Sequence, residues 1–200
     1  MRNFKRILSI ILIAIMSISL AACGLNMSEE EIEDACFKEA KKFVGGYLSN
    51  SSTNYLRKYE SDPEELLSMY KLKFRFNEFY SNSEAAEMVC DYILEHATFE
   101  VDPYSFHFDK DTERVEMAVN VTIISPPEAY SRIKDFMSKP TVVDVEQYEA
   151  EQIRLYNQAV SIISGIQPVT VSIPIELSYV DDEWIIQNHW MVMKYINEAA

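Results

Sequence analysis

The spacing of hydrophobic residues changes near the middle of this chain. Up to about residue 96, apolar residues recur every three or four positions, which is typical of amphipathic helices. Beyond residue 98 they alternate with polar residues, which is typical of half-buried strands. The change of period predicts an α+β fold, in which N-terminal helices pack on a four-stranded antiparallel sheet.

The first half carries the signals of several helices. Ser28 and Glu31 form a capping-box sequence before the first helix. The apolar stripe of this helix is Ile32, Cys36, Ala40, Phe43 and Tyr47. The glycines at 45–46 either end the helix or bend it. Ser81 and Glu84 form a second capping-box sequence. Further helices are expected over residues 54–60, 62–79 and 81–96.

The second half predicts four strands, over residues 99–108, 115–123, 169–179 and 184–192. Residues 109–113 and the pair at 181–182 turn the chain inside two hairpins, and Pro103 marks an edge strand or a bulge. A helical insert lies between strands two and three, with helices over 125–137 and 143–164. One α+β domain over residues 28–200 is the simplest organisation.

The N-terminus has the composition of a targeting segment. Arg2, Lys5 and Arg6 precede an apolar stretch of 16 residues, 7–22, whose polar members are three serines. A basic start, an apolar middle and small residues before a cut describe a secretory signal peptide, here residues 1–22. As a helix this stretch would span only ~24 Å, less than the ~30 Å hydrocarbon core.

The segment Leu20-Ala21-Ala22-Cys23 resembles the lipobox of bacterial lipoproteins. The resemblance implies cleavage before Cys23 and a diacylglyceryl group on its thiol, with residues 23–27 as the lipidated cysteine and a short tether. It also implies a location on the outer face of the bacterial cell membrane, with the outer membrane as the alternative. The alternatives are an ordinary signal peptide followed by a cysteine, and an uncleaved membrane anchor.

The order of elements and the hairpin over residues 179–186 resemble bacterial lipoproteins of unknown function that have a cone-shaped fold similar to nuclear transport factor two. The local mark is the aromatic Trp184 just after the acidic turn. The resemblance implies a curved sheet wrapped over helices, with a pocket at the wide end of the cone. The helical insert between strands two and three departs from this family. The resemblance implies no single activity, because fold does not fix function.

Aromatic side chains of the strands are the candidates for lining such a pocket. They are Tyr104, Phe106, Phe108, Trp184 and Trp190. Aromatic walls suit an apolar or amphipathic ligand, although such residues are more often plain core. Asn188 shares a predicted strand face with the two tryptophans, so that an inward face would make it a buried amide that needs partners.

Cys36 and Cys90 remain as a pair once Cys23 carries lipid. The compartment outside the membrane permits a disulfide between them. Two buried thiols are an equally natural outcome, because cysteine packs as a small apolar residue.

The sequence contains none of the common catalytic or metal-binding motifs. His96, His107 and His189 have no metal-ligand spacing, and we expect neither a metal nor another cofactor. The acidic clusters at 29–34, 109–113 and 181–183 are interpreted as caps and turns. We therefore expect a protein that is not an enzyme. The alternative is an enzyme with its active site in the cone pocket, using His189 or a tyrosine as a general base.

Charge narrows the classes of partner. The chain has 18 basic and 32 acidic residues, which gives a net charge of −14 and argues against nucleic-acid binding. Removal of residues 1–22, which hold three cations and no anions, leaves 15 − 32 = −17. Anionic headgroups repel such a domain, so its attachment depends on the lipid at Cys23. The expected function is that of a membrane-anchored extracytoplasmic lipoprotein that binds a protein partner, a cell-envelope component or a small ligand. An accessory subunit of a membrane complex is a third class.

Overall fold

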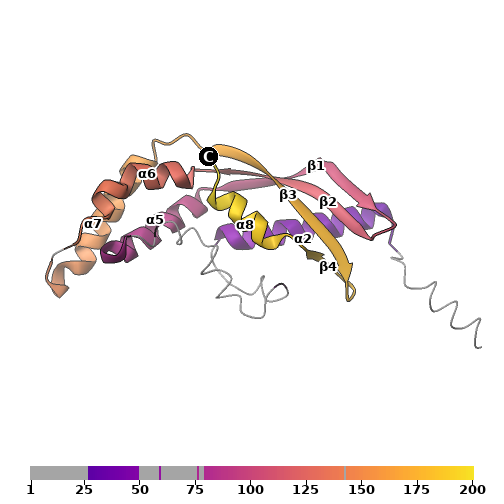
Figure 1. Ribbon diagram of the computed structural model, residues 1–200, viewed down its shortest axis with the longest axis horizontal. Helices are drawn as coiled ribbons and strands as arrows, with labels where there is room; N and C mark the ends of the chain where they lie inside the picture. The colour runs from indigo at the N-terminus through magenta and orange to yellow at the C-terminus, as the bar shows by residue number, and fades with distance from the viewer. Residues whose placement is uncertain (1–26, 50–58, 60–75, 77–78, 142) are drawn as a thin grey trace, which may run out of the picture. The chain divides into compact units, whose positions relative to one another are not determined.

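The computed structural model describes residues 27–49, 59, 76, 79–141 and 143–200 (Figure 1). The chain divides into two units after Ile32. The signal segment, the lipobox and most of the helices expected over 54–60 and 62–79 lie outside the described residues. In the first unit the backbone N–H of Ser28 donates to Glu31 Oε2 (2.7 Å), and the N–H of Glu31 donates to Ser28 Oγ (3.3 Å). The first predicted capping box is therefore confirmed.

The described chain has an α+β fold with one four-stranded antiparallel sheet, in the order β1-β2-β3-β4. Its elements are α2 (Glu29–Ser49), η2 (Tyr80–Asn82), α5 (Ser83–Glu95), β1 (Thr98–Asp109), β2 (Arg114–Ile123), α6 (Pro126–Met137), α7 (Val145–Ile163), β3 (Val169–Val180), β4 (Glu183–Ile186) and α8 (His189–Asn197). The sequence prediction of the fold class is confirmed at this level, and the two helices between β2 and β3 are present.

Each strand alternates between two faces. The inner face carries the buried residues of β2, β3 and β4, which are Val115, Met117, Val119, Val121, Ile123, Ile173, Ile175, Leu177, Trp184 and Ile186. The opposite face, here called the outer face, consists of the even-numbered residues of β2 and β3, Glu183 and Ile185 of β4, and residues 98, 100, 102, 107 and 109 of β1. The alternation of apolar and polar residues in the sequence therefore corresponds to the inner and outer faces of the sheet.

Strand β1 keeps its apolar residues on the inner face by means of a bulge. Its register against β2 shifts between Asp102 and His107. Five steps along β1 match two along β2, so β1 contains three extra residues, and an odd number of extra residues exchanges the two faces. Ser105 Oγ accepts the N–H of Ala118 and donates to the carbonyl of Asp102, both at 2.7 Å. The predicted role of Pro103 at an edge and a bulge is thus confirmed.

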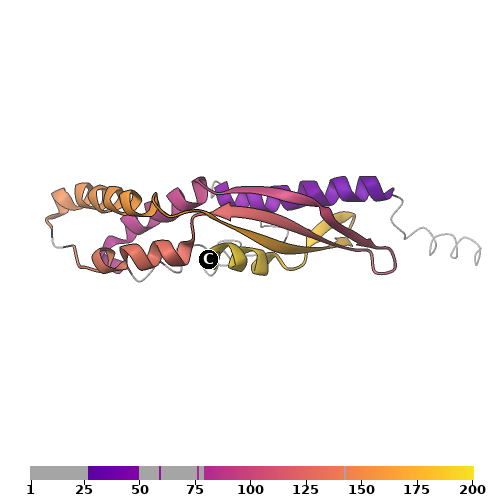
Figure 2. The ribbon, with the colours of Figure 1, turned by 90° about the horizontal axis from the view of Figure 1, so that it is seen from above.

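Helices α2 and α8 lie on the inner side of the sheet (Figures 1 and 2). The ring of Phe37 on α2 meets Phe106 edge-on, with centroids 6.0 Å apart. A Cβ at Gly45 would lie 3.4 Å from the ring of Phe99, so helix and strand approach closely there. The helix continues through Gly45 to Ser49. Tyr47 on α2 donates its hydroxyl to Asn197 on α8 (2.7 Å), which joins the two covering helices.

The last predicted strand is wrong beyond Ile186, because the chain turns into α8. Asn188 Oδ1 accepts the N–H of Glu176 (3.1 Å) and its Nδ2 donates to the carbonyl of Pro174 (2.9 Å). The side chain of Asn188 thereby takes the β3 groups that a longer β4 would have paired. From there on the buried residues Val192, Met193 and Ile196 follow a helical spacing.

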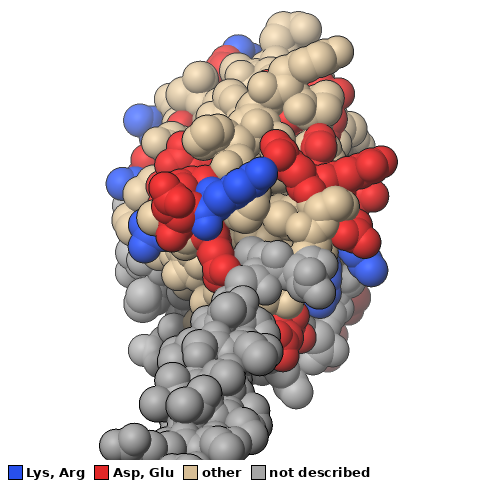
Figure 3. Space-filling view, turned by 90° about the vertical axis from the view of Figure 1, so that its right-hand side faces the viewer, with Lys and Arg blue, Asp and Glu red and all other residues tan. Residues whose placement is uncertain are grey.

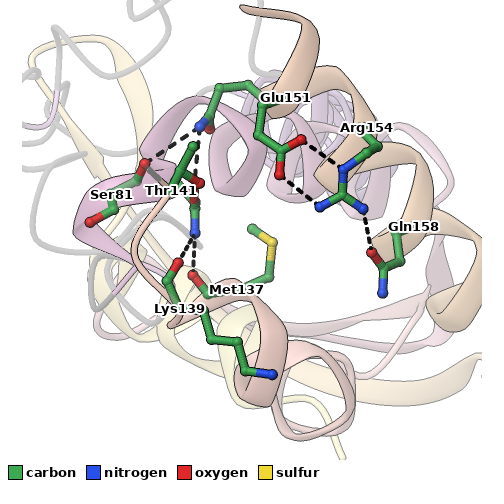
Figure 4. A network of polar contacts seen from close by, with 9 residues as sticks. Ser81, Met137, Lys139, Thr141, Glu151, Arg154 and Gln158 are labelled. Atoms are coloured by element: carbon green, nitrogen blue, oxygen red, sulfur yellow. Dashed lines mark hydrogen bonds and ion pairs between the residues drawn. The ribbon is translucent and has the colours of Figure 1, made fainter. Parts of the chain in front are cut away.

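Helices α5, α6 and α7 pack together around two buried amides (Figure 4). Asn82 Nδ2 donates to the carbonyls of Met137 (2.6 Å) and Lys139 (2.9 Å). Gln152 Oε1 accepts the N–H of Ala85 (3.1 Å) in the first turn of α5. The second predicted capping box, of Ser81 with Glu84, is therefore wrong: α5 begins at Ser83, and a side chain from α7 satisfies one of its first N–H groups.

Candidate functional site

The structure does not bring the predicted pocket residues together. Tyr104 stands 97% exposed at the bulge, and Trp190 is 40% exposed on α8 instead of on a strand. Phe106 packs on α2, as described above. Trp184 is buried on the inner face between Phe108 and Tyr179, with ring centroids 6.2 and 5.4 Å away. The interpretation of these aromatics as core fits Trp184, whereas Phe106 is only half-buried.

Asn188 is buried, as expected for an inward amide, but its partners belong to the protein. Both ends of the amide bond the backbone of β3. Its role is to end β4 and begin α8. It therefore does not point to a ligand pocket.

A cluster of titratable and aromatic side chains lies where α2, β4 and α8 meet. It consists of Glu39, Phe43, Tyr59 and His189. The hydroxyl of Tyr59 donates to Glu39 Oε1, and the rings of Tyr59 and His189 lie 5.3 Å apart at 34°. Phe43 meets both rings at steep angles, at 5.2 and 6.5 Å. The sequence did not reveal this cluster, because its members are separated by up to 150 residues and no spacing rule connects them.

The protonation of Tyr59, and of the nearby Cys36, argues against the use of these two groups in catalysis. Burial raises the pKa of Tyr59 far above its usual range, and the hydrogen bond to the Glu39 carboxylate raises it further. Burial likewise raises the pKa of the Cys36 thiol, one helical turn before Glu39, to about 12, with a smaller contribution from the Glu39 charge. Both groups stay protonated near neutral pH. Neither is poised as a base or nucleophile, because those roles need a pKa near the working pH.

The two remaining cysteines follow the second of the alternatives set out above. Cys36 on α2 and Cys90 on α5 are both buried, and both are thiols rather than halves of a disulfide. Their burial makes them part of the packing.

The histidines lie in three separate places. The ring of His96, after the last residue of α5, packs on Tyr92 at 4.0 Å, and its Nδ1 lies 2.8 Å from the Tyr92 carbonyl. His107 lies on the outer face, and His189 belongs to the Tyr59 cluster. Within the described residues, no group of three or more His, Cys, Asp or Glu side chains is arranged to hold a metal ion.

Both hairpins turn at one end of the sheet. The N–H of Tyr179 donates to the carbonyl of Glu113 (3.4 Å), which places the β1–β2 turn against β3. The Asp109 carboxylate accepts bonds from Thr112 Oγ1 (2.7 Å) and Asp111 N–H (2.9 Å), and these lower its pKa. Figure 3 looks onto this end, where red acidic side chains outnumber blue basic ones. The clusters at 109–113 and 181–183 are confirmed as turns.

The outer face of the sheet is the strongest candidate for a binding surface. α2 and α8 both cover the opposite face (Figure 2). At the β3–β4 hairpin the outer face has a shallow hollow of about 410 Å³, lined by Val180, Asp181, Glu183, Ile185 and Gln187. The sequence signal for this surface was the polar half of each alternating strand, which becomes a surface only once the register across the strands is known.

None of the helices within the described ranges combines the length and hydropathy needed to cross a bilayer. Comparisons with protein-family models, with curated proteins and with solved structures found no match for this chain.

Proposed function

We propose that this chain is a lipid-anchored extracytoplasmic protein whose α+β domain serves as a binding module. The observation that carries the anchor is Leu20-Ala21-Ala22-Cys23 directly after the apolar stretch. The diacylglyceryl group on Cys23 supplies two acyl chains, and two chains give stable anchoring where one does not. The location that follows is the outer face of a bacterial membrane.

We further propose that the domain has the curved, cone-like sheet of proteins similar to nuclear transport factor two. The contact that supports this is Phe108 with Trp184, because these rings come from the two edge strands, β1 and β4, and still approach to 6.2 Å. Edge strands meet across an inner face when the sheet curls. Unlike the open pocket that this family implies, the inner side here is occupied by α2 and α8.

Binding is the better supported role for the domain. The titratable residues Cys36 and Tyr59 are held in their protonated, unreactive forms. The outer face, in contrast, is accessible and carries a hollow. The enzyme alternative would depend on His189, whose neighbours Phe43 and Tyr59 surround it with rings.

The anchor is tested by metabolic labelling with a fatty-acid probe in a bacterial host. We expect the full chain to incorporate the probe and Cys23→Ala to lose it entirely. Cys36→Ala is the matched control, because it removes a buried cysteine and should keep full labelling. Persistent labelling of Cys23→Ala would overturn the lipid anchor, while leaving the binding role of the domain to be tested separately.

A further inference from the structure

We infer that the outer face of the sheet docks an extended, cationic segment of a protein partner, with Glu116 and Glu176 at the centre of the contact. The inference deepens the proposed function, since it names the surface and the chemistry of the partner. It needs the binding role of the domain but does not need the lipid on Cys23.

The central observation is a pair of like charges that face each other. Glu116 on β2 and Glu176 on β3 are in direct register, and both are exposed. Carboxylates directly opposite on neighbouring strands destabilise a sheet. In the part of the chain that the structure describes, no ion pair or hydrogen bond reaches either carboxylate. A cationic side chain placed between them would turn this repulsion into attraction.

The rest of the outer face has the same sign of charge. Its carboxylates are those of Glu100, Asp102, Asp109, Glu116, Glu176 and Glu183, and its one guanidinium is that of Arg114. A surface with six acidic groups and one basic group attracts cationic partners and repels anionic ones. Nucleic acids and anionic lipid surfaces are therefore disfavoured as occupants.

The hollow beside this pair adds an apolar contact. Val180 and Ile185 offer apolar surface there, with the first 46% exposed, and Glu183 and Gln187 stand beside them. The N–H of Gln187 donates to the carbonyl of Glu176 (2.7 Å), so the hollow adjoins the acidic pair. Lys and Arg have apolar stems and charged ends. A hollow with apolar walls beside carboxylates fits such side chains better than it fits a bare ion.

The shape of the face suits an extended chain. Its central rows have short side chains: Ala118, Asn120 and Thr122 on β2, and Thr170, Ser172 and Pro174 on β3. Thr122 and Thr170 share a hydrogen bond across the strands (2.7 Å), so their hydroxyls lie flat against the sheet. Basic residues at every second position of an extended segment project on one side and can reach the acidic groups together.

The experiment measures binding of a fluorescent ten-residue peptide of alternating Lys and Thr to the full chain in detergent micelles, by anisotropy. The test variant is Glu116→Gln/Glu176→Gln. The matched control is Glu146→Gln/Glu149→Gln on α7, which changes the net charge equally at exposed positions. We expect the test variant to weaken binding about tenfold, the change that corresponds to ~1.4 kcal/mol, and the control to change it less than about twofold. A peptide with Glu in place of Lys should not bind.

Several outcomes would overturn the inference. Equal losses in the two variants would mean that only net charge matters. Absence of binding up to about 1 mM peptide at low salt would remove the surface as a docking site. Equal affinity for spermine or for Ca²⁺, with displacement of the peptide by either, would assign the pair to a small cation. Urea unfolding of the test variant controls for folding: its midpoint should not fall, because the substitution relieves a repulsion. The Cys23→Ala protein, which carries no lipid, should still bind the peptide. Its binding tests the docking surface independently of the lipid anchor.

Discussion

The two faces of the sheet are built from the same four strands and have opposite relations to the rest of the chain. On the inner face, apolar side chains meet α2 and α8; those of β2 and β4 and of the second half of β3 are mostly buried, and those of β1 are half-buried. On the outer face, polar side chains reach solvent, and one row sets two carboxylates against each other. The inner face stabilises the fold through burial of its apolar side chains. The second face keeps an arrangement that costs stability, and such local costs are expected at functional or strained sites.

Substitutions at two neighbouring residues of β3, one on each face, give the clearest test of the difference between the faces. Ile175 is fully buried on the inner face, and Glu176 is exposed on the outer one. We expect Ile175→Ala to lower the free energy of unfolding by about 3–4 kcal/mol, because it removes buried methyl groups and leaves a cavity. Glu176→Ala should change it by less than about 0.5 kcal/mol. Urea unfolding followed by tryptophan fluorescence measures both, and similar losses would contradict the division into faces.

Replacement of Asn188 tests whether its side-chain hydrogen bonds to β3 stabilise the end of strand β4. Replacement by Ala leaves the Glu176 N–H and the Pro174 carbonyl without their side-chain partners, so we expect a loss of about 2 kcal/mol. Gln187→Ala is the control, because Gln187 is exposed and its side chain, among the described residues, bonds only the Ile185 carbonyl, two residues earlier. The same urea titration compares them. A loss in Gln187→Ala as large as that in Asn188→Ala would sink the proposed role of the buried amide.

Alkaline pH should lower the free energy of unfolding, in part through Cys36. Cys36 has a pKa raised from 9.0 to about 12 in the folded protein. Between these values the unfolded thiol ionises while the folded one stays protonated, so stability falls as pH rises above about 9. The fall from this group should approach ~1.4 kcal/mol per pH unit. Stability measured from pH 8 to 11 should show a shallower decline in Cys36→Ala, and parallel declines would refute the assignment.

A substitution in the bulge of β1, at the edge of the sheet, should lower the free energy of unfolding by a smaller amount. Ser105→Ala removes the hydroxyl that bridges Ala118 N–H and the Asp102 carbonyl. Water can reach this half-buried site, so we expect a loss of about 1 kcal/mol. Ser172→Ala, on the open outer face, should be nearly neutral in the same assay. A neutral Ser105→Ala would mean that the bulge holds its shape without the hydroxyl.

The smallest expected effect is a gain at the β3–β4 turn. Asp181 and Asp182 both have positive φ, 51° and 64°, as a two-residue type I′ hairpin requires. Glycine adopts this conformation without strain, and Asp-Gly is a favoured pair there. We expect Asp182→Gly to raise the free energy of unfolding by about 0.5 kcal/mol and Asp181→Gly to help less. A fall in the urea midpoint of Asp182→Gly would show that the aspartate side chain holds the turn.

Local patterns in the sequence were enough to predict the strands β2 and β3 and the helices α6 and α7. Each has a long run of one period and a clear boundary. An example is Ser125, the N-cap of α6, whose Oγ accepts the Glu128 N–H (3.3 Å). The bulge was also predicted, because Pro103 interrupts the alternation.

The failures share a different physical cause. Trp190 and Val192 continue the alternation of β4 by coincidence, and only the long-range bonds of Asn188 end that strand. Likewise α5 takes its N-terminal partner from Gln152, 67 residues away. The Tyr59 cluster and the Glu116–Glu176 pair depend on register and packing between distant segments. Side-chain spacing along the chain carries no information about such contacts.

The direction of α2 has a consequence for how far the domain can travel. Phe37 lies by Phe106, near the hairpin turns, and Gly45 lies by Phe99, so α2 runs antiparallel to β1. Glu33 therefore lies toward the end where the hairpins turn. Ten residues join Cys23 to Glu33, which reach ~35 Å at most. With lipid on Cys23, the short segment over residues 23–33 would confine the domain to a thin layer over the bilayer. A partner in that layer would meet it at an effective concentration near the millimolar range, so that even weak docking on the outer face would be occupied.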